Sequence, residues 1–132
     1  MVKKITSAFT LLMLGFFVLQ SFKNFPQDDK WNNCLVKYRF NWGETCNSCQ
    51  MAKDTYKVYL RNTCDETIDA VVCVQENTKR WRYYSFKKLA PKDSVSAYAC
   101  VGTGKILKWV KPSNNTELLL PTSDEVNAQY AK

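Results

Sequence analysis

The chain has 132 residues, of which 45% are hydrophobic and 14% aromatic, a composition that excludes a disordered polypeptide and fits one domain. It contains no histidine, which removes the usual general base of serine and cysteine hydrolases. The net charge is +7, from 19 basic and 12 acidic residues; without the first 25 residues, which hold three basic and no acidic ones, 16 basic and 12 acidic residues give +4, too mild to indicate a nucleic-acid partner.

Residues 1–25 predict a signal peptide. Lys3 and Lys4 precede an uncharged apolar run from residue 5 to residue 19, which is shorter than the roughly 20 residues of a membrane-spanning helix. The small-residue pattern of a cleavage site is poor, so cleavage anywhere from Ser21 to Gln27 and an uncleaved membrane anchor both stay open. We therefore expect export to the periplasm or the cell exterior.

Residues 26–53 predict a linker followed by the first part of a β domain. Residues 26–33 are polar and predict a linker, and the domain itself is expected over residues 34–121. Residues 35–42 alternate, with Val36, Tyr38, Phe40 and Trp42 on one face, which predicts a half-buried strand. Residues 43–53 predict a loop pinned by cysteines, with one helical turn near its end.

Further strands follow at spacings typical of an all-β domain. They are expected at residues 56–62, 67–75, 80–86, 94–100 and 105–111, with a short last strand at 118–120. The first two of these, joined by a short polar turn, predict a hairpin. Residues 122–132 predict a polar C-terminal tail, for which one frayed helical turn stays open, and no convincing amphipathic helix is evident. The pattern predicts a small antiparallel β-sandwich, immunoglobulin-like, of six to seven strands.

Six cysteines follow the predicted signal peptide, and they are disulfide candidates: Cys34, Cys46, Cys49, Cys64, Cys73 and Cys100. An even number in a small exported chain predicts two or three disulfides, although the sequence does not choose their pairing. The C-x-x-C spacing of Cys46 and Cys49 also suits zinc or redox chemistry. A second C-x-x-C, histidine and a βαβ setting are all missing, so structural disulfides are favoured and neither a metal nor a cofactor is predicted.

Other candidate motifs favour structural explanations. The segment Gly102–Lys105 resembles a phosphate-binding loop but lacks the earlier glycine and the Ser or Thr after the lysine, so it predicts a hairpin turn. Acidic residues occur as adjacent pairs in polar loops, whereas glycosidases place two carboxylates on separate elements. The sequence therefore predicts no catalytic residues and a protein that is not an enzyme.

Basic and aromatic residues interleave on two predicted strands and suggest a binding face: Trp81, Arg82, Tyr84, Lys105, Lys108 and Trp109. Such faces bind sugars or single-stranded nucleic acid, and an exported protein seldom meets the latter. The alternative interpretation places Trp81 and Trp109 in the core, with the lysines discouraging edge-to-edge pairing of sheets.

The stretch from residue 56 to residue 112 carries Asn62-x-Cys64, Trp81, Leu89-x-Pro91, and Tyr98-Ala99-Cys100 before a Gly-Thr-Gly turn. This skeleton resembles a group of small exported bacterial β-domains without an assigned activity. The resemblance implies a compact immunoglobulin-like sandwich and export. This chain departs from that skeleton at Lys92, where a glycine is expected, and at Tyr83 and Tyr84, where a cysteine is common. No cysteine pairing is therefore carried over from the group.

Three functions follow as hypotheses. The first is a non-enzymatic exported binding module for a protein or glycan, which rests on the aromatic and basic strands. The second is a secreted inhibitor of an extracellular enzyme, in which the rigid loop at residues 43–53 enters a cleft. The third is a thiol oxidoreductase that uses Cys46 and Cys49.

Overall fold

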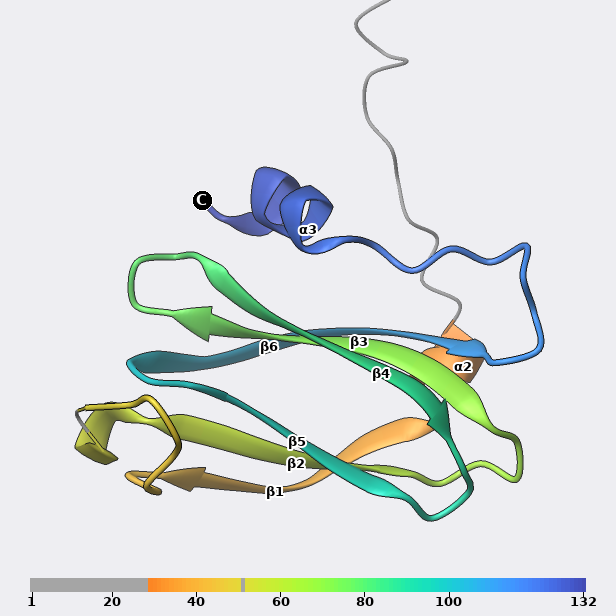
Figure 1. The fold of residues 1–132 in the computed structure, drawn as a ribbon, viewed down its shortest axis with the longest axis horizontal. Helices are drawn as coiled ribbons and strands as arrows, with labels where there is room; N and C mark the ends of the chain where they lie inside the picture. Colours follow the sequence, from red (N-terminus) through yellow and green to blue (C-terminus); the bar gives the residue numbers. More distant parts are fainter. Residues whose placement is uncertain (1–28, 51) are drawn as a thin grey trace, which may run out of the picture.

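The computed structural model describes residues 29–50 and 52–132, so the predicted signal peptide and residues 26–28 of the predicted linker lie outside the described residues. Six antiparallel strands form two three-stranded sheets that face each other (Figure 1). Sheet A has the order β1 (Leu35–Trp42), β2 (Tyr56–Asn62), β5 (Ser94–Ala99), and sheet B has the order β4 (Trp81–Leu89), β3 (Ile68–Glu76), β6 (Gly102–Pro112). The predicted class, a small disulfide-stabilised antiparallel β-sandwich, is confirmed.

Strand β3 is the centre of the molecule, because it is buried on both faces. Its Ala70, Val72 and Val74 point into the core between the sheets, while Val71 and Cys73 point outward into a second apolar cluster. A strand that is buried on both faces has a nearly continuous apolar sequence, and residues 70–74 form such a sequence. The second cluster requires a third layer above sheet B.

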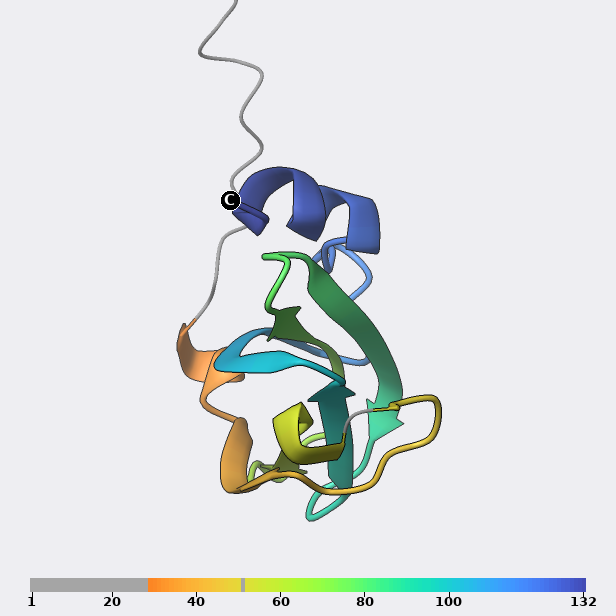
Figure 2. The same cartoon turned by 90° about the vertical axis from the view of Figure 1, so that its left-hand side faces the viewer.

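That third layer is helix α3 (Ser123–Tyr130), which lies across the outer face of sheet B (Figure 2). The prediction of a polar tail at residues 122–132 was therefore wrong. Thr122 caps the helix by accepting a hydrogen bond from the Glu125 N–H. Val126 is buried, and Tyr130 packs against Trp109 with tilted rings whose centroids are 5.7 Å apart. Only two apolar side chains one turn apart anchor the helix, which is too weak a periodicity to detect in sequence. The strand predicted at residues 118–120 is instead part of the loop leading to α3.

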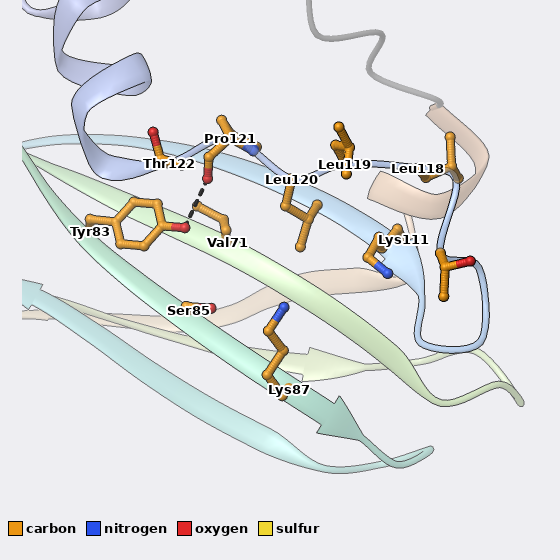
Figure 3. A pocket seen from close by; sticks show the side chains of 11 residues that line it. Val71, Tyr83, Ser85, Lys87, Lys111, Leu118, Leu119, Leu120, Pro121 and Thr122 are labelled. Carbon is orange, nitrogen blue, oxygen red and sulfur yellow. Dashed lines mark hydrogen bonds between the residues drawn. The ribbon is translucent and has the colours of Figure 1, made fainter.

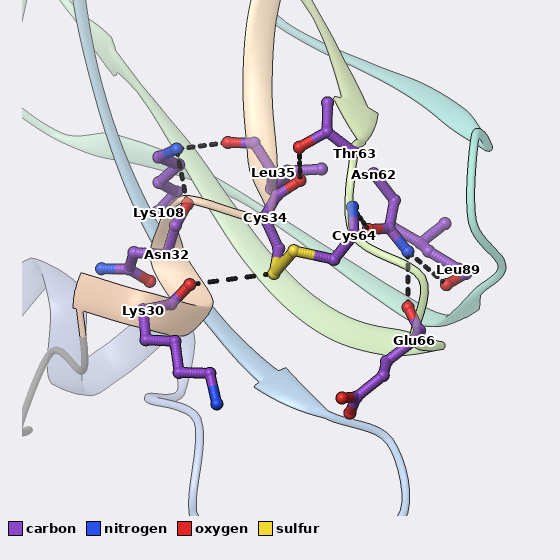
Figure 4. The surroundings of a disulfide bond; sticks show 10 residues. All are labelled: Lys30, Asn32, Cys34, Leu35, Asn62, Thr63, Cys64, Glu66, Leu89 and Lys108. Carbon is purple, nitrogen blue, oxygen red and sulfur yellow. Dashed lines mark hydrogen bonds between the residues drawn. A yellow bond between two sulfur atoms is a disulfide. The ribbon is translucent and has the colours of Figure 1, made fainter.

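The predicted hairpin between β2 and β3 was also wrong, because these strands belong to different sheets. Buried Asn62 fixes the crossing: its Nδ2 donates to the carbonyls of Glu66 (2.9 Å) and Leu89 (3.0 Å), and its Oδ1 accepts from the Cys64 N–H (Figure 4). The Cys34–Cys64 disulfide joins the start of β1 to the same turn. Side-chain bonds to the backbone thus replace a hairpin turn.

Two short helical segments complete the description. Helix α2 (Asp29–Asn32) occupies the end of the predicted linker and packs on β6, where the Val110 N–H donates to Asn32 Oδ1. The 3₁₀ turn η1 (Ala52–Asp54) closes the loop between β1 and β2.

Candidate functional site

The two tryptophans of the predicted binding face are covered rather than exposed. Trp81 and Trp109 are 8% and 3% exposed and lie beneath α3. The indole N–H of Trp81 donates to the Tyr130 carbonyl, and the Trp81 backbone exchanges hydrogen bonds with the Asn127 side chain. The structure thus places both tryptophans in the second apolar cluster.

The other four residues of that face do not join them. Arg82 and Tyr84 project from the opposite side of β4, and the Tyr84 hydroxyl donates to the Tyr98 carbonyl at 2.6 Å. Lys108 points from the inner side of β6, where its Nζ donates to the carbonyls of Asn32 and Leu35, and burial lowers its pKa. Lys105 is exposed. The six residues therefore do not form one surface.

The exposed apolar side chains gather instead on β1. Among the described residues, the large hydrophobic side chains that stand in solvent are Leu119 and four on this one strand: Val36 (39%), Tyr38 (46%), Phe40 (53%) and Trp42 (50%). Single exposed apolar residues are ordinary, whereas four of them on one edge strand indicate an interaction site. The expectation that β1 is half-buried was wrong.

A bulge in β1 explains how its aromatic residues come to lie on both faces. The register against β2 shifts between Lys37 and Arg39, so Tyr38 turns to the outer face of sheet A. Phe40 and Trp42 follow on the inner side, where the half-exposed Trp42 ring lies beside Gly104 of β6 and reaches Tyr56 at 4.8 Å between centroids. An alternating sequence pattern carries no sign of a bulge.

Strand β1 also offers free backbone groups, since it is the edge of sheet A. The Gly43 N–H donates to the Thr55 carbonyl, so residue 43 directs its hydrogen-bonding groups toward the β2 side. Antiparallel strands alternate such residues with ones whose N–H and C=O face away. The backbone groups of Phe40 and Trp42 accordingly point to the free side, and no strand among the described residues pairs with them.

Beside this edge, cations stack on tyrosine rings across the outer face of sheet A. The Arg39 guanidinium lies 4.1 Å from the ring centroid of Tyr59, and that of Arg61 lies 4.5 Å from Tyr38. Glu44 accepts hydrogen bonds from the Tyr59 hydroxyl, Lys57 Nζ and Asn41, and these lower the pKa of its carboxyl to about 2. The face is aromatic, cationic and held in place by its own contacts.

A hollow of about 360 Å³ lies elsewhere, between sheet B and the segment that leads to α3 (Figure 3). Lys87 and Lys111 line it, but both pair with Asp69, at 3.9 and 3.6 Å. The Tyr83 hydroxyl on its wall donates to the Pro121 carbonyl. Its charges and its hydroxyl already have partners within the fold, so β1 is the better candidate.

The cysteines pair as Cys34–Cys64 and Cys49–Cys100, while Cys46 and Cys73 are free and buried. Burial raises the pKa of Cys73 to about 12, so its thiol stays protonated. The hypothesis that Cys46 and Cys49 act as a redox pair does not match the pairing in this structure, in which Cys49 is bonded to Cys100 and Cys46 is free. Within residues 29–50 and 52–132, no cluster of three His, Cys, Asp or Glu side chains offers a metal site, and no helix is long and apolar enough to cross a membrane.

Comparisons with known proteins found no match: no family model, no curated protein and no solved structure matches the chain. Any function is therefore argued from the geometry of the site. The likeness to small exported bacterial β-domains stays a prediction.

Proposed function

We propose that this chain is an exported, non-enzymatic binding module whose partner docks along strand β1. The observation that carries the proposal is the coincidence of a free strand edge with four exposed large apolar side chains. Natural proteins blunt such an edge with bulges and charges, because it invites another chain to pair with it, and β1 carries a bulge between Lys37 and Arg39; the stretch from Phe40 to Trp42 beyond the bulge keeps a regular register and a free edge. Two disulfides support folding in an oxidising compartment, in keeping with export.

The strand order supports the finer proposal of an immunoglobulin-like sandwich. The sheets β1-β2-β5 and β4-β3-β6 correspond to strands A-B-E and C′-C-F of that fold. The strand that would follow beside β6 is absent from the described residues, where helix α3 crosses the outer face of sheet B instead. Beside β6, this side of the sandwich carries only the short helix α2 among the described residues, which packs near the start of β1.

Strand addition is the binding mode that fits this edge. A partner segment in extended conformation would bond to the N–H and C=O groups of Phe40 and Trp42 and place alternate apolar side chains against their rings. Lys37, whose Nζ lies 5.2 Å from the Phe40 ring centroid, and Arg39 are the cations of this strand. They favour acidic residues in the partner.

Phe40→Pro and Phe40→Ala test the proposal as a matched pair. Both remove the aromatic side chain, but only proline also removes the N–H at the free edge, a position where strands tolerate proline. Displayed random peptides would be selected on the wild-type protein, and their dissociation constants measured by titration calorimetry. We expect alternating apolar and acidic sequences that bind F40P about fivefold more weakly than F40A, the worth of one ~1 kcal/mol hydrogen bond.

Equal affinities of the two variants, or a selection that yields no binders, would contradict strand addition.

The stacked cations favour one further candidate, an anionic glycan on the outer face of sheet A, where the Arg39 and Arg61 guanidinium groups lie against the rings of Tyr59 and Tyr38. Binding of heparin that disappears in Arg39→Gln and Arg61→Gln but survives in F40P would support the glycan over the peptide.

A further inference from the structure

Three cysteines occupy one corner of the molecule, and two of them are bonded. Asn47 and Ser48 form the centre of a turn that is closed by the Cys49 N–H donating to the Cys46 carbonyl at 3.2 Å. Such turns bring the Cα atoms at their two ends within about 7 Å, and disulfides span roughly 4.4–6.8 Å between Cα atoms. Cys46 is therefore positioned as an alternative partner for Cys49, which is bonded to Cys100.

Arg82 makes the two sulfur atoms of the existing disulfide unequal. Its Nη1 donates to Cys100 Sγ at 3.2 Å, while its guanidinium lies 4.9 Å from the Tyr98 ring centroid and 3.7 Å from Glu76 Oε1. A cation beside a sulfur atom stabilises the thiolate and so makes that sulfur the better leaving group. Cys49 and Cys100 are both partly exposed, so the bond is accessible from solvent.

We propose that this corner is a thiol–disulfide exchange site at which Cys49 changes its partner from Cys100 to Cys46. The Cys46 thiol gives its proton to water, and its sulfur forms a bond to Cys49 Sγ. The Cys49–Cys100 bond breaks, and its electron pair leaves on Cys100 Sγ beside Arg82, where it takes up a proton from water. One thiol and one disulfide are present before and after, so no oxidant is needed.

Small-molecule or protein thiols are the co-reactants that this site would accept. An external thiolate attacks Cys49 and expels Cys100, and Cys46 then displaces the external thiol from the mixed disulfide. The end state is the same as that of the internal exchange, and the external thiol is regenerated. The substrate class is therefore a thiol with access to a partly exposed disulfide.

Exchange would release the loop between β1 and β2 from the end of β5. The Cys49–Cys100 bond ties this loop down, and the Tyr98 hydroxyl adds a hydrogen bond to the Asn47 carbonyl at 2.9 Å. The same loop carries Glu44, which holds Lys57 and Tyr59 on the outer face of sheet A. The exchange site thus neighbours the cationic face without depending on its binding role.

Trypsin fragments report the exchange directly. Cys46 and Cys49 share the fragment 40–53, whereas Cys100 lies in the fragment 93–105. The native protein would be incubated with a small amount of reduced glutathione at pH 8, alkylated, quenched with acid and digested without reduction. We expect fragment 40–53 to appear alone, lighter by its two thiol hydrogens, together with fragment 93–105 alkylated at Cys100.

Variants separate exchange from general reactivity. Cys46→Ser should abolish both products, Arg82→Gln should slow their appearance about tenfold, and Cys73→Ser, remote from the corner, should leave them unchanged. Wild-type fragments that stay linked while Cys46 is alkylated would overturn the proposal without any variant. Equal alkylation of Cys100 in C46S would also overturn it, and an unchanged rate in R82Q would overturn Cys100 as the preferred leaving sulfur.

Discussion

Strands β3 and β1 are both rich in apolar residues, yet they end in opposite environments. β3 is buried at eight of its nine positions, whereas β1 is buried at one of its eight. β3 lies between β4 and β6, with sheet A below it and α3 above, while β1 has one neighbour and an uncovered face. Apolar content therefore does not decide burial; the number of elements that cover a strand does.

The largest expected effect on the free energy of unfolding emerges when two side chains on the inner side of sheet A are truncated in turn. Leu60 is 0% exposed and Phe40 is 53% exposed. Leu60→Ala should lower the free energy of unfolding by about 2–5 kcal/mol, because it leaves a cavity in the core. Phe40→Ala should change it by about 0.5 kcal/mol or less. Urea denaturation of both variants checks this, and a large loss in F40A would mean that β1 is covered in solution.

A smaller loss of unfolding free energy is expected when the packing of α3 on sheet B is weakened. Val126 is the buried residue of α3 and belongs to the cluster of Trp81 and Trp109. Val126→Ala removes two buried methyl groups and should cost about 2 kcal/mol of unfolding free energy, followed by tryptophan fluorescence. Gln129→Ala, an exposed change on the same helix, is the control. Equal stability of the two variants would show that α3 does not stabilise the sheet.

The smallest effect concerns Asp69, a carboxylate on the outer side of sheet B. Hydrogen bonds from the Lys88 N–H and Ser113, with Lys111 and Lys87 nearby, outweigh the cost of burial and lower its pKa below 3.8. A carboxyl with a depressed pKa stabilises the fold above its unfolded pKa, and this contribution disappears as pH falls through the folded value. Asp69→Asn should therefore cost about 1 kcal/mol at pH 7 and progressively less below pH 3.8. A constant difference across pH would contradict this assignment.

Much of the fold could be predicted because strand signals are local. Alternation placed all six strands close to their observed bounds. Which strands pair is a matter of long-range contact. The side-chain bonds of Asn62, which carry the chain from one sheet to the other, leave no periodic trace in the sequence.

The candidate site was harder to predict, for a physical reason. Trp81 and Tyr38 are both aromatic residues near cations, and only the position of α3 makes one buried and the other exposed. The sequence did contain one usable signal, since residues 36–40 hold only apolar or cationic side chains. Such a strand has no polar face toward water, although its alternation predicts a half-buried strand.

The two disulfides together also determine how the domain carries mechanical load. Pulling on the two ends of the chain sends the force from Cys34 through the sulfur atoms to Cys64, and from this junction to Cys100 by the shorter covalent route, which runs to Cys49 and across the second disulfide. β1 and β2 lie on this route and bear the tension, whereas β3, β4 and β5 lie on the longer route between Cys64 and Cys100 and stay slack. A module tethered by its N-terminus and loaded at its C-terminus would extend β6 and α3, which lie beyond Cys100, while the centre of the sandwich is protected from extension by its two covalent bonds.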